Sequence, residues 1–181
     1  MILKIDMKPV SSRPIITVKS CINCKDVFIN AIIDTGATKA FWVDDYNYLK
    51  ALSNEHLSDN GVASGFGKTP QRNMPVELID LYINDNNNKG IHLLDLPVTY
   101  ANINTNGLFS LVLPYTLFNK FEFGFLNNGE HKCNQFYLNT GDMQINYKAL
   151  TDDNEQIIDV LISSENNDSE AFDRLKIKSF N

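Results

Sequence analysis

The chain has 181 residues, 43% of them hydrophobic and 21% charged, a composition typical of one folded globular domain and unlike that of a disordered chain. Its formal charge of -6 comes without a Lys/Arg block that could follow a phosphate backbone, so nucleic acid is not expected as a partner. No secretory leader pattern and no apolar run of membrane-spanning length are present, so we expect a soluble, cytoplasmic protein without membrane contact.

The first predicted element is a β-hairpin. "PIITVKS" and "DVFINAIIDTG" are rich in β-branched residues, and the polar turn "CINCK" separates them. The second strand of this hairpin ends at Asp34. After it, "DYNYLKALSNE" predicts a short helix that Asp44 or Asp45 would cap.

The middle of the chain predicts further strands. Strands are expected on either side of a glycine-rich tip, "ASGFGK", and "NDNNNKG" is typical of a surface turn. The next strand, "IHLLDLPVTYANI", contains Pro97, which is typical of an edge strand or a bulge. A buried strand from Leu111 to Leu113 then stops at Pro114, and a short helix and another strand follow.

The carboxyl-terminal part divides in two. "QFYLNTGDMQINYKAL" predicts a hairpin around the turn "NTGD". From Thr151 the sequence turns polar and acidic, and "EQIIDVLISS" suggests one short helix. Many short strands and little helix predict an all-β barrel or sandwich. We therefore expect a β domain over residues 1–150 and a polar, acidic appendage over 151–181.

Three cysteines do not form a disulfide framework, but their surroundings raise the question of a metal. Cys21 and Cys24 form a C-x-x-C pair, and His131 and Cys133 supply two more donors of the type that zinc binds. The second pair is H-x-C and lies far along the chain, so the spacing is a weak zinc signal. Two surface cysteines in a turn and an unrelated third explain the pattern better, and a zinc-stabilised β domain stays open as a minor alternative.

The sequence Asp34-Thr35-Gly36 directly follows an apolar strand, which is a costly place for a carboxylate. Two carboxylates held about 3 Å apart cannot both ionise, so they share a proton and can serve as joint base and acid on one water. Asp-Thr-Gly occurs once, and Asn139-Thr-Gly is better explained as a hairpin turn than as an inactive second half. A pair would therefore require a symmetric homodimer, with one Asp34 from each copy.

"AIIDTGAT", the glycine-rich "ASGFGK" and "LVLPYTLFNKFEF" together resemble the landmarks of the retropepsin-like aspartic proteases, the single-domain, homodimeric relatives of retroviral proteases also found in bacteria and mobile elements. The resemblance covers about Ile15 to Tyr147, in order and spacing. The family's first motif reads hydrophobic, hydrophobic, Asp, Thr or Ser, Gly, Ala or Ser, and residues 32–37 match each position.

The resemblance implies a retropepsin-like barrel with one short helix after the Leu111–Leu113 strand, and an aspartic endopeptidase that hydrolyses an extended polypeptide. Asp34 would be catalytic, Thr35 would orient the pair, Gly36 would permit close approach, and Ala37 would line the pocket floor. Neither a metal nor an organic cofactor is needed for such chemistry.

Two features depart from the family pattern. The flap candidates Gly65, Phe66 and Gly67 match it only loosely, and a plain surface loop explains them nearly as well. Pro114 stands where relatives carry Gly, and proline fixes φ and lacks an N–H. A catalytically inactive, dimeric peptide-binding module is therefore the alternative function.

Overall fold

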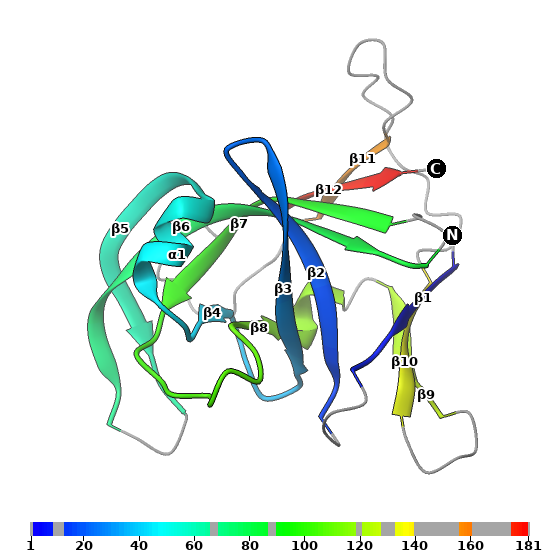
Figure 1. Cartoon of the computed structure of the whole chain (residues 1–181), viewed down its shortest axis with the longest axis horizontal. Coiled ribbons are helices and arrows are strands. Elements are labelled where there is room, and N and C mark those ends of the chain that lie inside the picture. The colour runs from blue at the N-terminus through cyan, green and yellow to red at the C-terminus, as the bar shows by residue number, and fades with distance from the viewer. Residues whose placement is uncertain are drawn as a thin grey trace.

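The computed structural model describes residues 2–8, 13–65, 69–86, 90–118, 121–127, 133–139, 156–160 and 175–180. Within these residues most of the chain is extended (Figure 1). The strands are β1 (Ile2–Asp6), β2 (Ile15–Ile22), β3 (Lys25–Asp34), β4 (Ala40–Trp42), β5 (Ser53–Ala63), β6 (Gln71–Asn84), β7 (Gly90–Tyr100), β8 (Leu111–Pro114), β9 (Glu122–Asn127), β10 (Cys133–Asn139), β11 (Gln156–Val160) and β12 (Leu175–Phe180). The helices are α1 (Tyr46–Leu52) and the 3₁₀ helix η1 (Tyr115–Phe118).

Six of the strands close into a barrel. They pair in the order β7, β4, β8, β3, β2 and β6, and β6 pairs with β7 again, which completes the ring. The seam between β2 and β6 is narrow, because a single residue pair, Lys19 with Tyr82, joins the two strands. Strand β5 extends the barrel as the outer arm of a long hairpin with β6 (Figure 1). The expected all-β barrel, with a short helix directly after the Leu111 strand, is confirmed.

A separate sheet packs beside the barrel. Strands β1, β10 and β9 form it in that order, all antiparallel. Its aromatic side chains meet the helix η1, where the rings of Phe118 and Phe136 lie edge to face with centroids 5.2 Å apart. Both rings are fully buried. Strand β1 was not expected, although Leu3 and Ile5 alternate with polar residues and point into the core.

The hairpin predicted from "CINC" is present as β2 and β3. Ile22 pairs with Lys25, so Asn23 and Cys24 form a two-residue turn. Their φ angles are +50° and +61°, as a type I′ turn requires, and this turn matches the twist of the two strands. The predicted helix is also present as α1, and Asp45 is its N-cap because its side chain accepts from the Asn47 N–H.

The predicted irregularity near Pro97 is a bulge and not an edge. Strand β7 is paired on both sides there, with β6 and with β4. The register against β6 shifts between the pairs Ile79–Leu96 and Leu81–Leu93, which leaves one extra residue on β7. Asp95 has a φ of +50° at this point, so the bulge precedes the proline by two residues.

The helix considered around "EQIIDVLISS" is wrong, because residues Gln156–Val160 form strand β11. The β-branched Ile157, Ile158 and Val160 favour an extended chain. Strand β11 pairs with β12, and β12 pairs with β7 beside the barrel (Figure 1). The second arm of the predicted "NTGD" hairpin lies outside the described residues.

Candidate active site

Asp34 is the last residue of β3, at an end of the barrel. Here β3 pairs with β8 in parallel, which sets Ile33 beside Leu113 and Asp34 beside Pro114. The two segments are far apart in sequence, so this pairing brings two of the sequence landmarks together. The Asp34 side chain is partly exposed, and Thr35 and Gly36 are exposed. The carboxylate can therefore be reached from outside.

A local turn orients the carboxylate of Asp34. The Gly36 N–H donates to its Oδ1 at 2.8 Å, the pattern of an Asx turn, and hydrogen bonds to a carboxylate are among the stronger ones. Gly36 does not have a positive φ, and a Cβ placed there would meet only this oxygen, at 3.4 Å. The turn within this chain therefore does not require glycine at this position.

An apolar cluster lies beside this turn. Ala37 and Ile32 are half-buried against it, and Ala63 at the end of β5 belongs to it. Its buried members are Ile15, Phe41, Val43, Ala63, Ala101, Phe109 and Val112. The cluster thus connects the end of β3 with the outer part of the β5–β6 hairpin.

Pro114 is buried as the last residue of β8 and leads directly into η1. No peptide bond in the described residues is cis. Because proline has no N–H, this position beside Asp34 cannot donate a hydrogen bond to the carboxylate or to a ligand. Asn139, considered above as an inactive counterpart, ends β10 and donates from its side-chain amide to Glu122 Oε2 at 3.0 Å, which is a structural contact.

Of the three flap candidates, only Gly65 is among the described residues. It follows β5 and has a φ of +102°, and a Cβ added at this position would meet no atom within 4 Å. Space is therefore not the constraint here, but that φ strongly favours glycine. The strands expected on both sides are present as β5 and β6, whereas Phe66 and Gly67 lie outside the described residues.

Only two of the four candidate zinc donors have side chains that the structure describes. Cys21 and Cys24 are exposed, free thiols at the tip of the β2–β3 hairpin. In the parts of the chain that the structure describes, no three His, Cys, Asp or Glu side chains are placed to hold a metal ion. His131 and the side chain of Cys133 lie outside the described part, so the zinc site stays an untested minor alternative.

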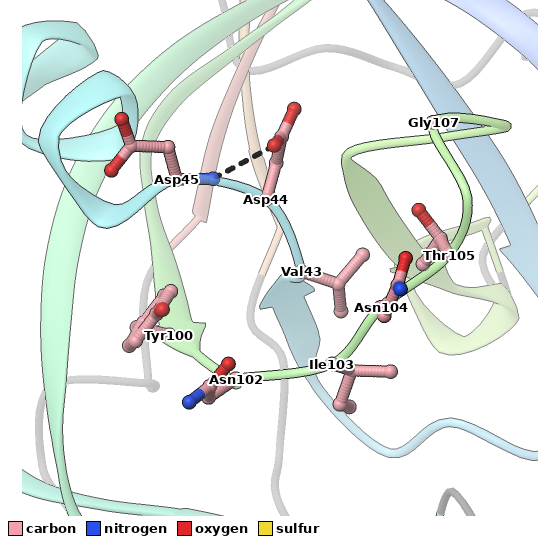
Figure 2. A pocket seen from close by; sticks show the side chains of 9 residues that line it. All are labelled: Val43, Asp44, Asp45, Tyr100, Asn102, Ile103, Asn104, Thr105 and Gly107. Carbon is pink, nitrogen blue, oxygen red and sulfur yellow. Dashed lines mark hydrogen bonds between the residues drawn. The ribbon is translucent and has the colours of Figure 1, made fainter.

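A shallow hollow of about 290 Å³ lies between the start of α1 and the loop that follows β7 (Figure 2). Asp34 is not among the residues that line it, which are Val43, Asp44, Asp45, Tyr100, Asn102, Ile103, Asn104, Thr105 and Gly107. Its carboxylates have structural partners: Asp44 accepts from the Asp45 N–H at 2.8 Å and from Ser110 Oγ at 2.8 Å, and Asp45 caps α1. We assign no ligand to it.

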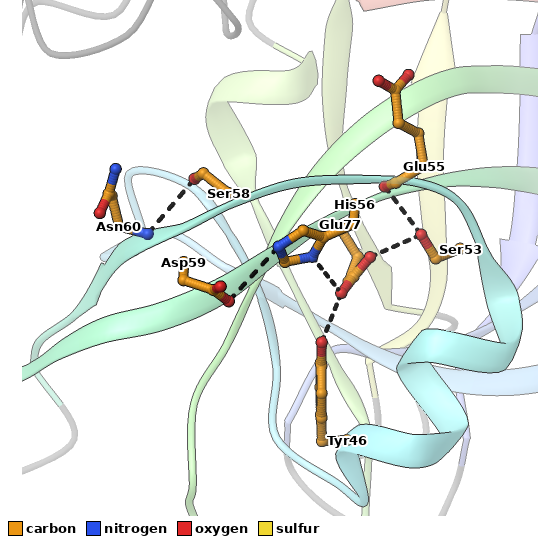
Figure 3. Close-up of polar contacts among 8 residues, drawn as sticks. All are labelled: Tyr46, Ser53, Glu55, His56, Ser58, Asp59, Asn60 and Glu77. Atoms are coloured by element: carbon orange, nitrogen blue, oxygen red, sulfur yellow. Dashed lines mark hydrogen bonds and ion pairs between the residues drawn. The ribbon is translucent and has the colours of Figure 1, made fainter.

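A second polar cluster was not expected from the sequence (Figure 3). Glu77 on β6 is 1% exposed, and its carboxylate accepts from Tyr46 Oη at 2.7 Å and from Ser53 Oγ at 2.8 Å. His56 Nδ1 lies 2.9 Å from the same carboxylate, and its Nε2 lies 3.5 Å from Asp59. Glu77 shares the buried face of β6 with Ile79 and Leu81, as strand alternation predicts, but nothing in the sequence shows which groups satisfy its carboxylate.

Burial and hydrogen bonds shift the pKa values of three residues in this cluster. Burial raises the pKa of Glu77, but the hydrogen bonds from Tyr46, His56 and Ser53 outweigh it, so the pKa lies below its ordinary 4.5. The hydrogen bond to Glu77 raises the pKa of His56 above its ordinary 6.5. Burial, with the contact to Glu77, raises the pKa of Tyr46 to about 12. Glu77 therefore stays ionised and joins α1, β5 and β6.

Comparison with known proteins gives a similarity in structure and none in sequence. No protein-family model matches the chain, and no curated protein matches its sequence. A retropepsin-like aspartic protease from Rickettsia conorii is similar in structure, with 12% identity, a TM-score of 0.45, and coverage of 77% of this chain and 90% of that one. Similarity at this level carries no inference about activity. In the described residues, no helix is long and apolar enough to span a membrane.

Proposed function

We propose that the chain is one subunit of a homodimeric aspartic endopeptidase, in which the two Asp34 side chains form the catalytic pair. The observation that carries the proposal is the position of Asp34: a reachable carboxylate at the end of β3, oriented by the Gly36 N–H and set beside β8. The absence of a side chain at Gly36 supports the proposal. Because its own chain does not require glycine there, the space it leaves suits the approach of a second copy or a substrate backbone.

The mechanism follows from two carboxylates that share one proton. The ionised Asp34 takes a proton from a water molecule, and the water oxygen bonds to the carbonyl carbon of the substrate. The protonated Asp34 gives its proton to the carbonyl oxygen, which yields a neutral tetrahedral diol. The Asp34 that took the water proton then gives it to the peptide nitrogen as the C–N bond breaks, and the other Asp34 takes a proton from one diol hydroxyl as the carbonyl re-forms. Protons are conserved through the cycle, and no cofactor takes part.

The neighbouring residues have supporting roles in this proposal. The exposed Thr35 orients the pair across the dimer axis, and Ala37, packed on the apolar cluster, forms part of the floor under the substrate. Gly65, with Phe66 and Gly67, would cover the substrate from the β5–β6 hairpin. The substrate is an extended peptide, because hairpin and sheet edges recognise backbone in that form.

One observation favours the alternative, a dimer that binds peptides without cleaving them. Pro114 pairs with Asp34 and has no N–H to offer to the carboxylate or the substrate. If that donor is needed for turnover, the fold retains peptide binding alone. The two functions differ in a single measurable respect, which is whether bound peptide is cut.

The test is cleavage of a diverse peptide library, read by mass spectrometry at pH 4 to 7 with the full chain. Removing an acid–base group costs about 10²–10⁴-fold in rate, so Asp34→Asn should abolish detectable cleavage. Asp26→Asn is the matched control, since Asp26 is exposed on the opposite end of the same strand and should leave cleavage unchanged. Peptide binding without cleavage by a wild-type dimer would favour the inactive module, and a protein that stays monomeric and neither binds nor cuts would contradict both.

A further inference from the structure

The outer part of β6 leaves the barrel. The ladder between β6 and β7 has its first pair at Val76 and Thr99, whereas β6 itself begins at Gln71. Between these points β6 is paired with β5, through Met74 with Gly61 and Gln71 with Ala63. This arm of the hairpin therefore needs another contact to fix its position relative to the barrel.

A bulge bends the first part of β6 next to Gln71. Two steps along β5, from Gly61 to Ala63, are matched by three steps along β6, from Met74 to Gln71. Asn73, inside this interval, has a φ of +56°. An extra residue in a left-handed conformation bends the strand and re-aims the side chains next to it. Gln71 is the first side chain beyond the bend.

The Gln71 side chain bridges back to the barrel. Its Nε2 donates to the carbonyl oxygen of Asn102 at 3.2 Å, and its Oε1 accepts from the Asn102 N–H at 3.0 Å. The preceding residue, Ala101, still donates to the Trp42 carbonyl at 2.7 Å, so Asn102 is where the chain after β7 departs from β4. One side-chain amide thus satisfies both backbone groups of Asn102 as a neighbouring strand would.

We propose that Gln71 is a positioning residue. It holds the first part of β6, residues 71–75, against the loop after β7 and so fixes the position of the β5–β6 hairpin relative to Asp34. Gln71 pairs with Ala63, which packs in the same apolar cluster as Ala37 and Ile32. The bridge therefore acts on the surroundings of Asp34 without touching the reacting atoms. The catalytic part of this inference rests on the proposed function, and the structural part does not.

The structural part is tested by hydrogen exchange of backbone amides in the full chain. Because Gln71→Ala removes the acceptor of the Asn102 N–H, it should lower the protection factor of this amide about tenfold and that of the β6 segment around Met74 by less. Arg72→Ala, at the exposed neighbouring position, is the matched control and should leave both unchanged. Equal protection of Asn102 in the wild type and in Gln71→Ala would overturn the proposal.

The nearly isosteric variant Gln71→Glu gives a sharper test and guards against misfolding of the alanine variant. At pH 7 its carboxylate can accept from Asn102 but cannot donate, and it repels the Asn102 carbonyl. Near pH 4 the carboxyl group protonates and can donate again, since an unperturbed Glu has a pKa of about 4.3. Protection of Asn102, corrected for intrinsic rates, should be low at pH 7 and recover near pH 4. A pH profile identical to that of the wild type would overturn the proposal.

The catalytic part has its own readout. Loss of the bridge leaves the hairpin to be positioned by the substrate, so Gln71→Ala should raise KM about tenfold and leave kcat nearly unchanged, as loss of uniform binding does. A fall in kcat at constant KM would contradict a positioning role. The exchange experiment repeated in Asp34→Asn should give the same protection, so failure of the proposed peptidase activity would show as absent cleavage while the exchange result still stands.

Discussion

Replacing the buried Glu77 by glutamine should destabilise the protein by an amount that depends on pH. The carboxylate is 1% exposed and accepts hydrogen bonds from Tyr46 and Ser53 at 2.7 and 2.8 Å. Glutamine keeps the shape but loses the charge. A hydrogen bond to a charged group is worth about 1 kcal/mol more than a neutral one, so these two bonds alone predict a loss of about 2 kcal/mol.

The pH dependence follows from the two pKa shifts. Glu77 has a lowered pKa, so its contribution is present above its ordinary 4.5 and is lost as pH falls through the lowered value. His56 has a raised pKa, so its contribution is complete below its ordinary 6.5 and is lost as pH rises through the raised value. Both contributions to stability are present between pH 4.5 and pH 6.5. The difference between wild type and Glu77→Gln should be largest in that window.

Thermal unfolding followed by circular dichroism checks this prediction at pH 5.5 and pH 8.5. In a protein of this size, 1 kcal/mol corresponds to about 2–4 °C, so the bonds from Tyr46 and Ser53 predict a fall of about 4–8 °C at pH 8.5, and the protonated His56 makes the fall larger at pH 5.5. Glu55→Gln is the matched control, because Glu55 is exposed and points away from the cluster, and it should change stability by less than about 0.5 kcal/mol (Figure 3). An equal midpoint difference at both pH values, or none at pH 5.5, would refute the reasoning.

Three further substitutions test the local geometry by denaturant unfolding. Gly61→Ala should cost about 1–3 kcal/mol, because its Cβ would lie 2.7 Å from the Met74 carbonyl oxygen; an unchanged midpoint would contradict this crowding. Cys24→Gly should stabilise by about 1 kcal/mol, since φ at this position is +61°; destabilisation that a chelator abolishes would instead indicate a metal bound by this thiol. Asp45→Ala should cost about 1 kcal/mol through loss of the α1 cap on Asn47, and Asp45→Asn should recover most of it.

Elements defined by neighbours in sequence could be predicted. The β2–β3 hairpin followed from two β-branched runs around a short turn, and the start of α1 followed from a capping aspartate. The Asp34 strand end was visible because an apolar run stopped at a carboxylate. By contrast, a strand pattern can place Glu77 on the face of Ile79 and Leu81 but cannot show that α1 and β5 supply the hydrogen-bond donors for its carboxylate.

The sequence by itself determined the all-β class, the position of Asp34 at a strand end and the short helix after β8, because backbone propensity, capping and turn chemistry act over a few residues. Only the tertiary structure decided that β8 lies beside β3, that Glu77 collects its partners from two other elements, and that Gln71 reaches Asn102. Those contacts join segments distant in sequence, and barrel closure selects among many pairings that local patterns leave equally favourable.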